Sequence, residues 1–90
     1  MPFVLVRHKV RDFAAWKPFF DADVEARKET GLHTKLVLRS ADDPQEIFLL
    51  FETDDLGKAR EFAQAPQLAE VMQKAGVLDR PDMYFLENAE

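Results

Sequence analysis

His8 is the residue of this chain best suited to chemistry at neutral pH. It alternates with Val6 and Val10 in an apolar segment, so the three side chains would share one face of a strand. An imidazole, with an unperturbed pKa of about 6.5, can act as a general base or orient a phenolic hydroxyl group. Trp16 can form an aromatic wall of such a site, and Tyr84 can supply a hydroxyl. These three residues form the predicted ligand site, with His8 as its catalytic candidate.

Each of these residues also has a purely structural interpretation. His8 can be a half-buried histidine hydrogen-bonded to a carboxylate or a carbonyl, because the sequence offers no second catalytic partner. Trp16 shares helical spacing with Phe13 and Phe20, which is typical of a core residue. Tyr84 can extend its hydroxyl group into solvent. The sequence alone leaves these alternatives open.

The other charged residues predict surface structure. His33 with Glu52, and Arg39 with Glu46, are expected to pair across two strands at the rim of an interface. A solvated helix end accounts for Glu25, Arg27, Lys28 and Glu29. A turn accounts for Asp42 and Asp43.

The composition excludes several classes of site and partner. With no cysteine and two histidines in 90 residues, neither thiolate chemistry nor a usual structural zinc site is available, so no metal is predicted. The net charge of −5 and the lack of a basic run longer than Arg7-His8-Lys9 argue against nucleic-acid binding. The apolar stretch after Met1 breaks at Arg7, too short for a membrane span or a signal peptide, so a cytoplasmic location is expected.

The spacing of apolar residues predicts the elements that position the site. Residues 3–10 favour a strand, and Asp12 is the expected N-cap of a helix with an apolar stripe. Pro18 is expected to kink that helix or tighten its first turn, and Gly31 to end it. The stripe consists of Phe13, Trp16, Phe20 and Val24.

The second half of the chain predicts two helical segments and a last strand. Asp54 and Asp55 are suited to begin a helix, Pro66 to begin a second short one, and Gly76 to end it. Residues 77–82 are expected to form a loop and residues 83–88 a strand.

Residues 32–39 and 46–53 predict a hairpin whose second strand is unusually apolar. Five consecutive apolar residues, 47–51, indicate that both faces of this strand are covered. In the predicted register Arg39 faces Glu46 and His33 faces Glu52. One face then carries Val37, Phe48 and Leu50, and the face for the helices carries Leu36, Leu38, Ile47, Leu49 and Phe51.

Two split strand–helix–strand units predict one domain, residues 1–90, with an α+β, ferredoxin-like βαββαβ fold. Its four-stranded antiparallel sheet would have both helical segments on one face. The other face needs a second cover, which a second copy of the chain can supply. Val37, Phe48 and Leu50 are therefore the predicted homodimer interface.

With these elements in place, the chain resembles the dimeric α+β barrel superfamily, in which two ferredoxin-like sheets pack face to face. In particular, it looks like the small bacterial proteins related to antibiotic-biosynthesis monooxygenases, which are often labelled only as cyclase-like or hypothetical. The resemblance spans the chain and implies fold and dimerisation more than chemistry. It implies no cofactor, because such monooxygenases need neither metal nor flavin. The matching stretches are His8-Lys9-Val10, Asp12-Phe13, Trp16-Lys17, Asp54-Asp55-Leu56, Ala59-Arg60-Glu61-Phe62 and Pro66 through Leu68 to Ala75-Gly76-Val77.

The haem-degrading members of that superfamily are a poor match. They use an Asn on the first strand, a Trp later in the chain and a His on the second helix. This chain has Trp16 alone, no His after His33 and no Asn before Asn88.

Three functions remain open, and whether the protein is an enzyme is not decided by the sequence. The first is a homodimer that binds a small apolar or aromatic molecule between sheet and helices. The second is a cofactor-independent monooxygenase or cyclase-like enzyme acting on an aromatic or polyketide substrate. The third is a regulatory or assembly module without a ligand. A cavity of several hundred Å³ reaching His8 and Trp16 would favour the first two, and a filled core the third.

Overall fold

Four antiparallel strands form one sheet in the order β2-β3-β1-β4, in a computed structural model that describes residues 1–78 and 80–90. The central strands are β1 and β3, as the ferredoxin-like prediction requires. The elements in chain order are β1 (Phe3–Lys9), α1 (Phe13–Ala22), α2 (Val24–Glu29), β2 (Leu32–Arg39), β3 (Glu46–Thr53), α3 (Leu56–Gln64), α4 (Pro66–Lys74) and β4 (Asp82–Leu86).

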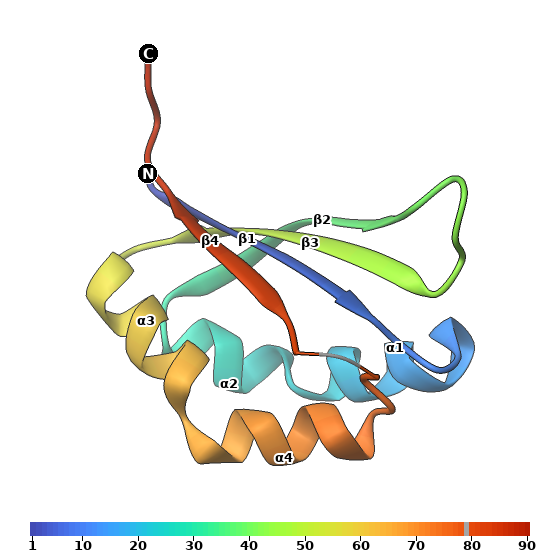
Figure 1. Cartoon of the computed structure of the whole chain (residues 1–90). Coiled ribbons are helices and arrows are strands. Elements are labelled where there is room, and N and C mark those ends of the chain that lie inside the picture. The colour runs from blue at the N-terminus through green and yellow to red at the C-terminus, as the bar shows by residue number, and fades with distance from the viewer. Residues whose placement is uncertain (79) are drawn as a thin grey trace.

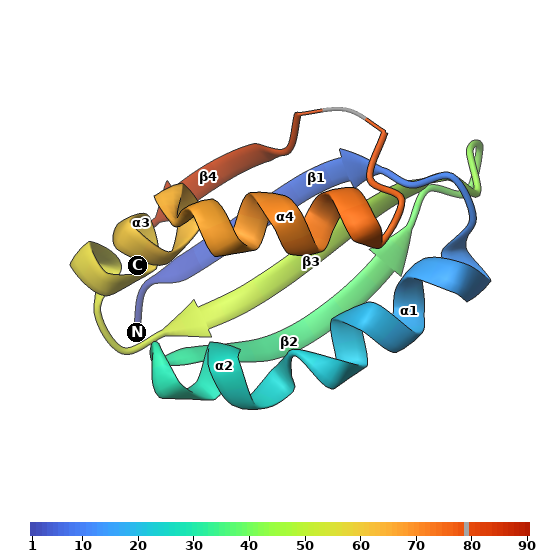
Figure 2. The same cartoon turned by 90° about the horizontal axis from the view of Figure 1, so that it is seen from below.

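All four helices lie on one face of the sheet, and no helix covers the other face within the described residues (Figure 1). Seen from the helix side, α1 and α2 run along the β2 edge, while α3 and α4 lie over β1 and β4 (Figure 2). Strand β3 is visible between these two helix pairs. The predicted α+β fold is therefore confirmed, with a helix layer that is divided in two.

The predicted helix boundaries follow from local chemistry. The Asp12 carboxylate accepts a hydrogen bond from the amide of Ala14, and Asp55 accepts one from Gly57, so both residues are N-caps. Gly31 follows α2 with a φ of +79°, a conformation that glycine adopts without strain. Pro66 occupies the first turn of α4, where its missing amide proton costs nothing.

The first helical segment is interrupted at Asp23, whereas the sequence predicts the irregularity at Pro18. Helix α1 continues through Pro18 to Ala22, and α2 begins at Val24. At the break, the carbonyl of Phe20 accepts hydrogen bonds from the Asp23 amide at 3.3 Å and from Arg27 Nη1 at 2.8 Å. The Arg27 side chain therefore satisfies a carbonyl that the interrupted helix leaves without its usual partner, and this stabilises the turn.

A β-bulge in β2 corrects the predicted hairpin register. His33 does face Glu52, but the pairing shifts between Thr34 and Leu36, because Lys35 is an extra residue in the ladder. Beyond the bulge Val37 faces Leu49 and packs against the core, so its prediction as an open-face residue is wrong. The open face carries Leu36 and Leu38 instead, opposite Leu50 and Phe48.

The same shift separates the predicted Arg39–Glu46 pair. Arg39 faces Ile47, and its guanidinium lies 5.3 Å from the centre of the Phe13 ring. Glu46 pairs with Arg7 on β1, with 2.8 Å between Nη2 and Oε2.

The core lies between the sheet and the helices. It comprises Val4, Val6, Val10, Trp16, Leu32, Ile47, Leu49, Phe51, Ala59 and Ala75. Strand β4 begins at Asp82 and ends at Leu86, slightly earlier than predicted. Of the predicted loop over residues 77–82, residue 79 lies outside the described residues, while Val77 bridges Val10.

We expect Asp55→Ala to lower the free energy of unfolding by about 1 kcal/mol, because the first amides of α3 lose their carboxylate acceptor. Asp55→Asn retains an acceptor and is the matched control. Urea denaturation measures both. Equal losses for the two variants would contradict the capping role.

Candidate functional site

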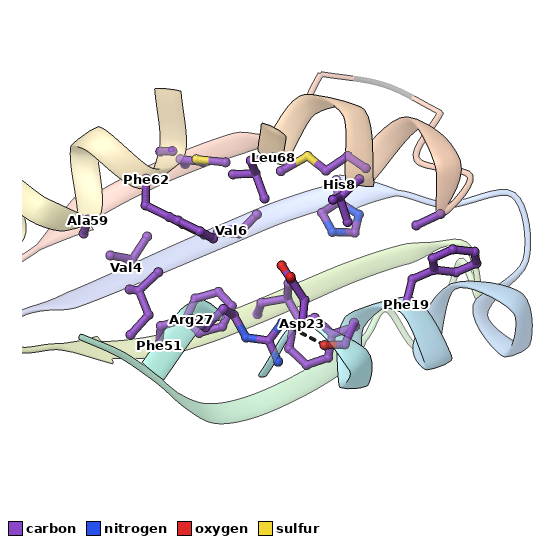
Figure 3. A pocket seen from close by; sticks show the side chains of 18 of the residues that line it. Val4, Val6, His8, Phe19, Asp23, Arg27, Phe51, Ala59, Phe62 and Leu68 are labelled. Carbon is purple, nitrogen blue, oxygen red and sulfur yellow. Dashed lines mark hydrogen bonds between the residues drawn. The ribbon is translucent and has the colours of Figure 1, made fainter. Parts of the chain in front are cut away.

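A cavity of about 90 Å³ lies between the two helix pairs, with the sheet as its floor (Figure 3). It is smaller than the several hundred Å³ typical of small-molecule sites, yet it reaches both His8 and Trp16. Strands β1 and β3 supply the floor, chiefly Val4, Val6, His8, Leu49 and Phe51. The core is therefore not completely filled at the place where the sequence predicts a site.

His8 and Trp16 lie in contact on the cavity wall. Each is only 3 % exposed, and the ring centres are 5.5 Å apart in an edge-to-face arrangement. Trp16 also packs against Phe13 and Phe20, with ring centres 5.6 and 5.0 Å away. Trp16 is thus both a core residue and a cavity wall, and the imidazole of His8 packs against its indole ring.

Tyr84 does not line this cavity, so its predicted place in the ligand site is wrong. Side chains alternate along β4, and its neighbours Met83 and Phe85 pack against the core. Tyr84 faces Leu5 on the opposite side of the sheet and is 51 % exposed.

Arg27 is a buried cavity residue, which corrects its prediction as part of a solvated helix end. It is 6 % exposed, and its guanidinium carbon lies 3.8 Å from the centre of the Phe20 ring. Nη1 donates to the Phe20 carbonyl, whereas Nε is buried without a hydrogen-bond partner among the described residues. An unsatisfied buried donor costs about 1–3 kcal/mol, and more when charged.

The electrostatics around Arg27 are set by burial and by two nearby carboxylates. Burial lowers the pKa of Arg27, and the charges of Asp23 and Asp21 oppose that shift. A guanidinium remains protonated under such conditions, so the cavity contains a fixed positive charge. Asp23 also lines the cavity, and Figure 3 shows it beside the cleft with Arg27 and His8.

The sequence does contain a signal for Arg27. The apolar stripe of the first helical segment continues from Phe20 through Val24 to Arg27 at helical spacing. Charge alone suggests solvent exposure, but position on the stripe indicates burial.

The remaining candidates lie elsewhere. His33 pairs with Asp54, with 3.2 Å between Nε2 and Oδ2, outside the residues that line the cavity. Among the described residues no three histidine or carboxylate side chains converge as a metal site would require. The helices described here are all too short or too polar to cross a membrane.

Comparison with known proteins yields matches of structure only. No family model and no curated protein matches the sequence. A Bordetella bronchiseptica structure, provisionally described as an antibiotic biosynthesis monooxygenase, is 14 % identical with a TM-score of 0.80, over 99 % of this chain and 97 % of that chain. A Caulobacter crescentus structure with the same provisional description is 16 % identical with a TM-score of 0.70, over 99 % and 90 %. The Mycobacterium tuberculosis protein Rv0793 is 17 % identical with a TM-score of 0.69, over 100 % and 97 %.

The chain has the fold of these antibiotic-biosynthesis-monooxygenase-like structures. The resemblance predicted from the sequence is confirmed at this level. Because one fold hosts many chemistries, the activity named for these structures does not follow for this chain.

Proposed function

We propose that the protein binds a small, predominantly apolar molecule in the cleft between its two helix pairs. The observation that carries this proposal is the cavity itself, which is lined by aliphatic and aromatic side chains around three polar ones, His8, Asp23 and Arg27. An apolar pocket with a few polar groups is the usual design of a small-molecule site. A module without a ligand has no need of an unfilled apolar cleft, because protein cores are normally close-packed, and this makes that alternative weaker.

Binding is tested by thermal shift with indole and 1-naphthol. At ten times the Kd we expect a stabilisation of about 1.4 kcal/mol, which raises the Tm of a domain this small by roughly 5–10 °C. Ala63→Phe places a ring in the cavity and should abolish the shift, whereas Ala22→Phe, on an exposed position of α1, should retain it. Equal responses of the two variants would contradict binding in this cleft.

The open face of the sheet supports the proposal that the protein is a homodimer. Leu36 and Leu38 are each 48 % exposed, Tyr84 is 51 % exposed and Leu86 is 40 % exposed. Together with half-buried Phe3, Leu5, Phe48 and Leu50 they form an apolar surface across the strands. Such a contiguous apolar patch on a small domain marks an interaction surface. The same face of a second copy of the chain matches it in shape and polarity.

Ion pairs border this apolar surface. Arg7 contacts Asp82 at 3.4 Å in addition to Glu46, and Lys35 contacts Glu52 at 3.9 Å. Polar groups around an apolar centre are typical of protein interfaces.

We expect Leu50→Asp to convert the dimer into a 10.4 kDa monomer, because it buries an unpaired charge at the centre of the interface. Ala15→Asp, at an exposed site on α1, is the control. Sedimentation velocity at micromolar concentration distinguishes the two. A Leu50→Asp protein that still sediments as two chains would contradict this interface.

A second candidate is a cofactor-independent monooxygenase or cyclase-like enzyme acting on an aromatic or polyketide substrate. Its support is the position of His8 on the cavity wall, together with the monooxygenase descriptions of the similar structures. In this scheme His8 accepts the proton of a phenolic or enolic hydroxyl, and a carbon of the electron-rich anion bonds to dioxygen to form a peroxide. Loss of water from the peroxide leaves a quinone carbonyl, so the substrate itself supplies the two electrons that reduce the second oxygen atom to water.

For this second candidate we expect His8→Ala to lower oxygen uptake with fused-ring phenols such as 1-naphthol by about 10²–10⁴-fold, the usual contribution of a general base. An oxygen electrode measures the rate, and the thermal melt of the variant shows whether it remains folded. An unchanged rate in folded His8→Ala would leave His8 with a structural role only.

A further inference from the structure

We propose that Arg27 anchors the carboxylate of a small apolar acid in the cleft. The inference rests on the proposed binding function and specifies its ligand class. Two observations carry it: Arg27 is 6 % exposed while lining the cavity, and its Nε has no hydrogen-bond partner among the described residues.

The orientation of the guanidinium is fixed before any ligand arrives. Its Cζ atom lies 3.8 Å from the centre of the Phe20 ring, and Nη1 donates to the Phe20 carbonyl at 2.8 Å. Nε and Nη2 form the opposite edge of the group, with two parallel N–H bonds. That edge matches the two oxygens of a carboxylate, which arginine commonly binds in bidentate geometry.

The guanidinium itself favours an anion over a neutral oxygen. Asp21 and Asp23 act on Arg27 electrostatically, but neither forms a direct ion pair with it in the part of the chain described here. A buried cation without a contacting anion is poorly compensated in an apolar cleft. Asp23, which also lines the cleft, would repel an anionic ligand and so limits its affinity.

The rest of the cleft defines the body of the ligand. Its walls are aliphatic and aromatic, and Met72 is among them. Phe62 and Leu68 lie on the helices opposite Arg27 (Figure 3). The volume of about 90 Å³ suits a small ring system or a short alkyl chain, with a flexible methionine at its border. The acid inferred is therefore a short aryl- or alkyl-carboxylic acid.

The experiment compares 3-phenylpropionate with the neutral 3-phenylpropionamide by calorimetry and NMR titration at pH 7. We expect the full-length wild type to bind the acid at least tenfold more tightly than the amide. Arg27→Met should abolish that preference. Asp23→Asn, which removes the repelling charge, should increase the ratio of acid affinity to amide affinity severalfold.

The NMR resonance of the Arg27 Nε–H group reports the contact directly. Saturation with 3-phenylpropionate should shift it downfield in the wild type, whereas the amide should shift it far less. If Arg27→Met does not fold, Arg27→Lys keeps the charge without the Nε–Nη2 edge, and it should lose most of the preference.

Each other result overturns the inference. Equal affinity for acid and amide, or an Arg27 Nε–H resonance that the acid does not move, removes Arg27 as the anchor while leaving apolar binding intact. If 3-phenylpropionate, 3-phenylpropionamide, indole and 1-naphthol all show no binding, both the proposed binding function and the role of Arg27 as anchor are contradicted.

Discussion

The apolar character of β3 on both faces is the constraint on which the rest of this structure depends. Ile47, Leu49 and Phe51 point into the helix-side core, where they are at most 5 % exposed. Phe48 and Leu50 point to the other face, beside β1 and the part of β2 beyond the bulge. One chain of this size can cover only the first set with its own helices. The same strand therefore organises both the core and the surface proposed for dimerisation.

The divided helix layer is the second determinant, because it creates the cleft. A single continuous layer of helices would fill the space above β1 and β3 with side chains. Here residues of α1 and α2 line one wall of the cleft and residues of α3 and α4 line the other (Figure 3). The aromatic cluster around Trp16 supports the first wall, so the cleft is bordered by well-packed residues.

The polar groups at the cleft come from different elements and differ in chemistry. His8 on β1 supplies an imidazole, while Arg27 on α2 carries a permanent charge. Asp23 adds a carboxylate at the helix break. An apolar cleft with a base and a cation can bind an oxygen-bearing apolar molecule and, in an enzyme, stabilise its anion. This combination links the binding and oxygenase proposals.

The sequence by itself determined the elements, their order and the fold, because apolar periodicity, N-caps and glycines act locally. It also placed His8 and Trp16 on the core side, since strand alternation and helix spacing leave little freedom. Only the tertiary structure determined where the side chains of Val37, Tyr84 and Arg27 lie. A one-residue bulge at Lys35 turns Val37 to the other face of the sheet. The alternation of side chains along β4 directs Tyr84 away from the cleft. The charged side chain of Arg27 is buried because it packs on the Phe20 ring and donates to the Phe20 carbonyl. Register and desolvation depend on contacts between residues distant in sequence, which local patterns do not encode.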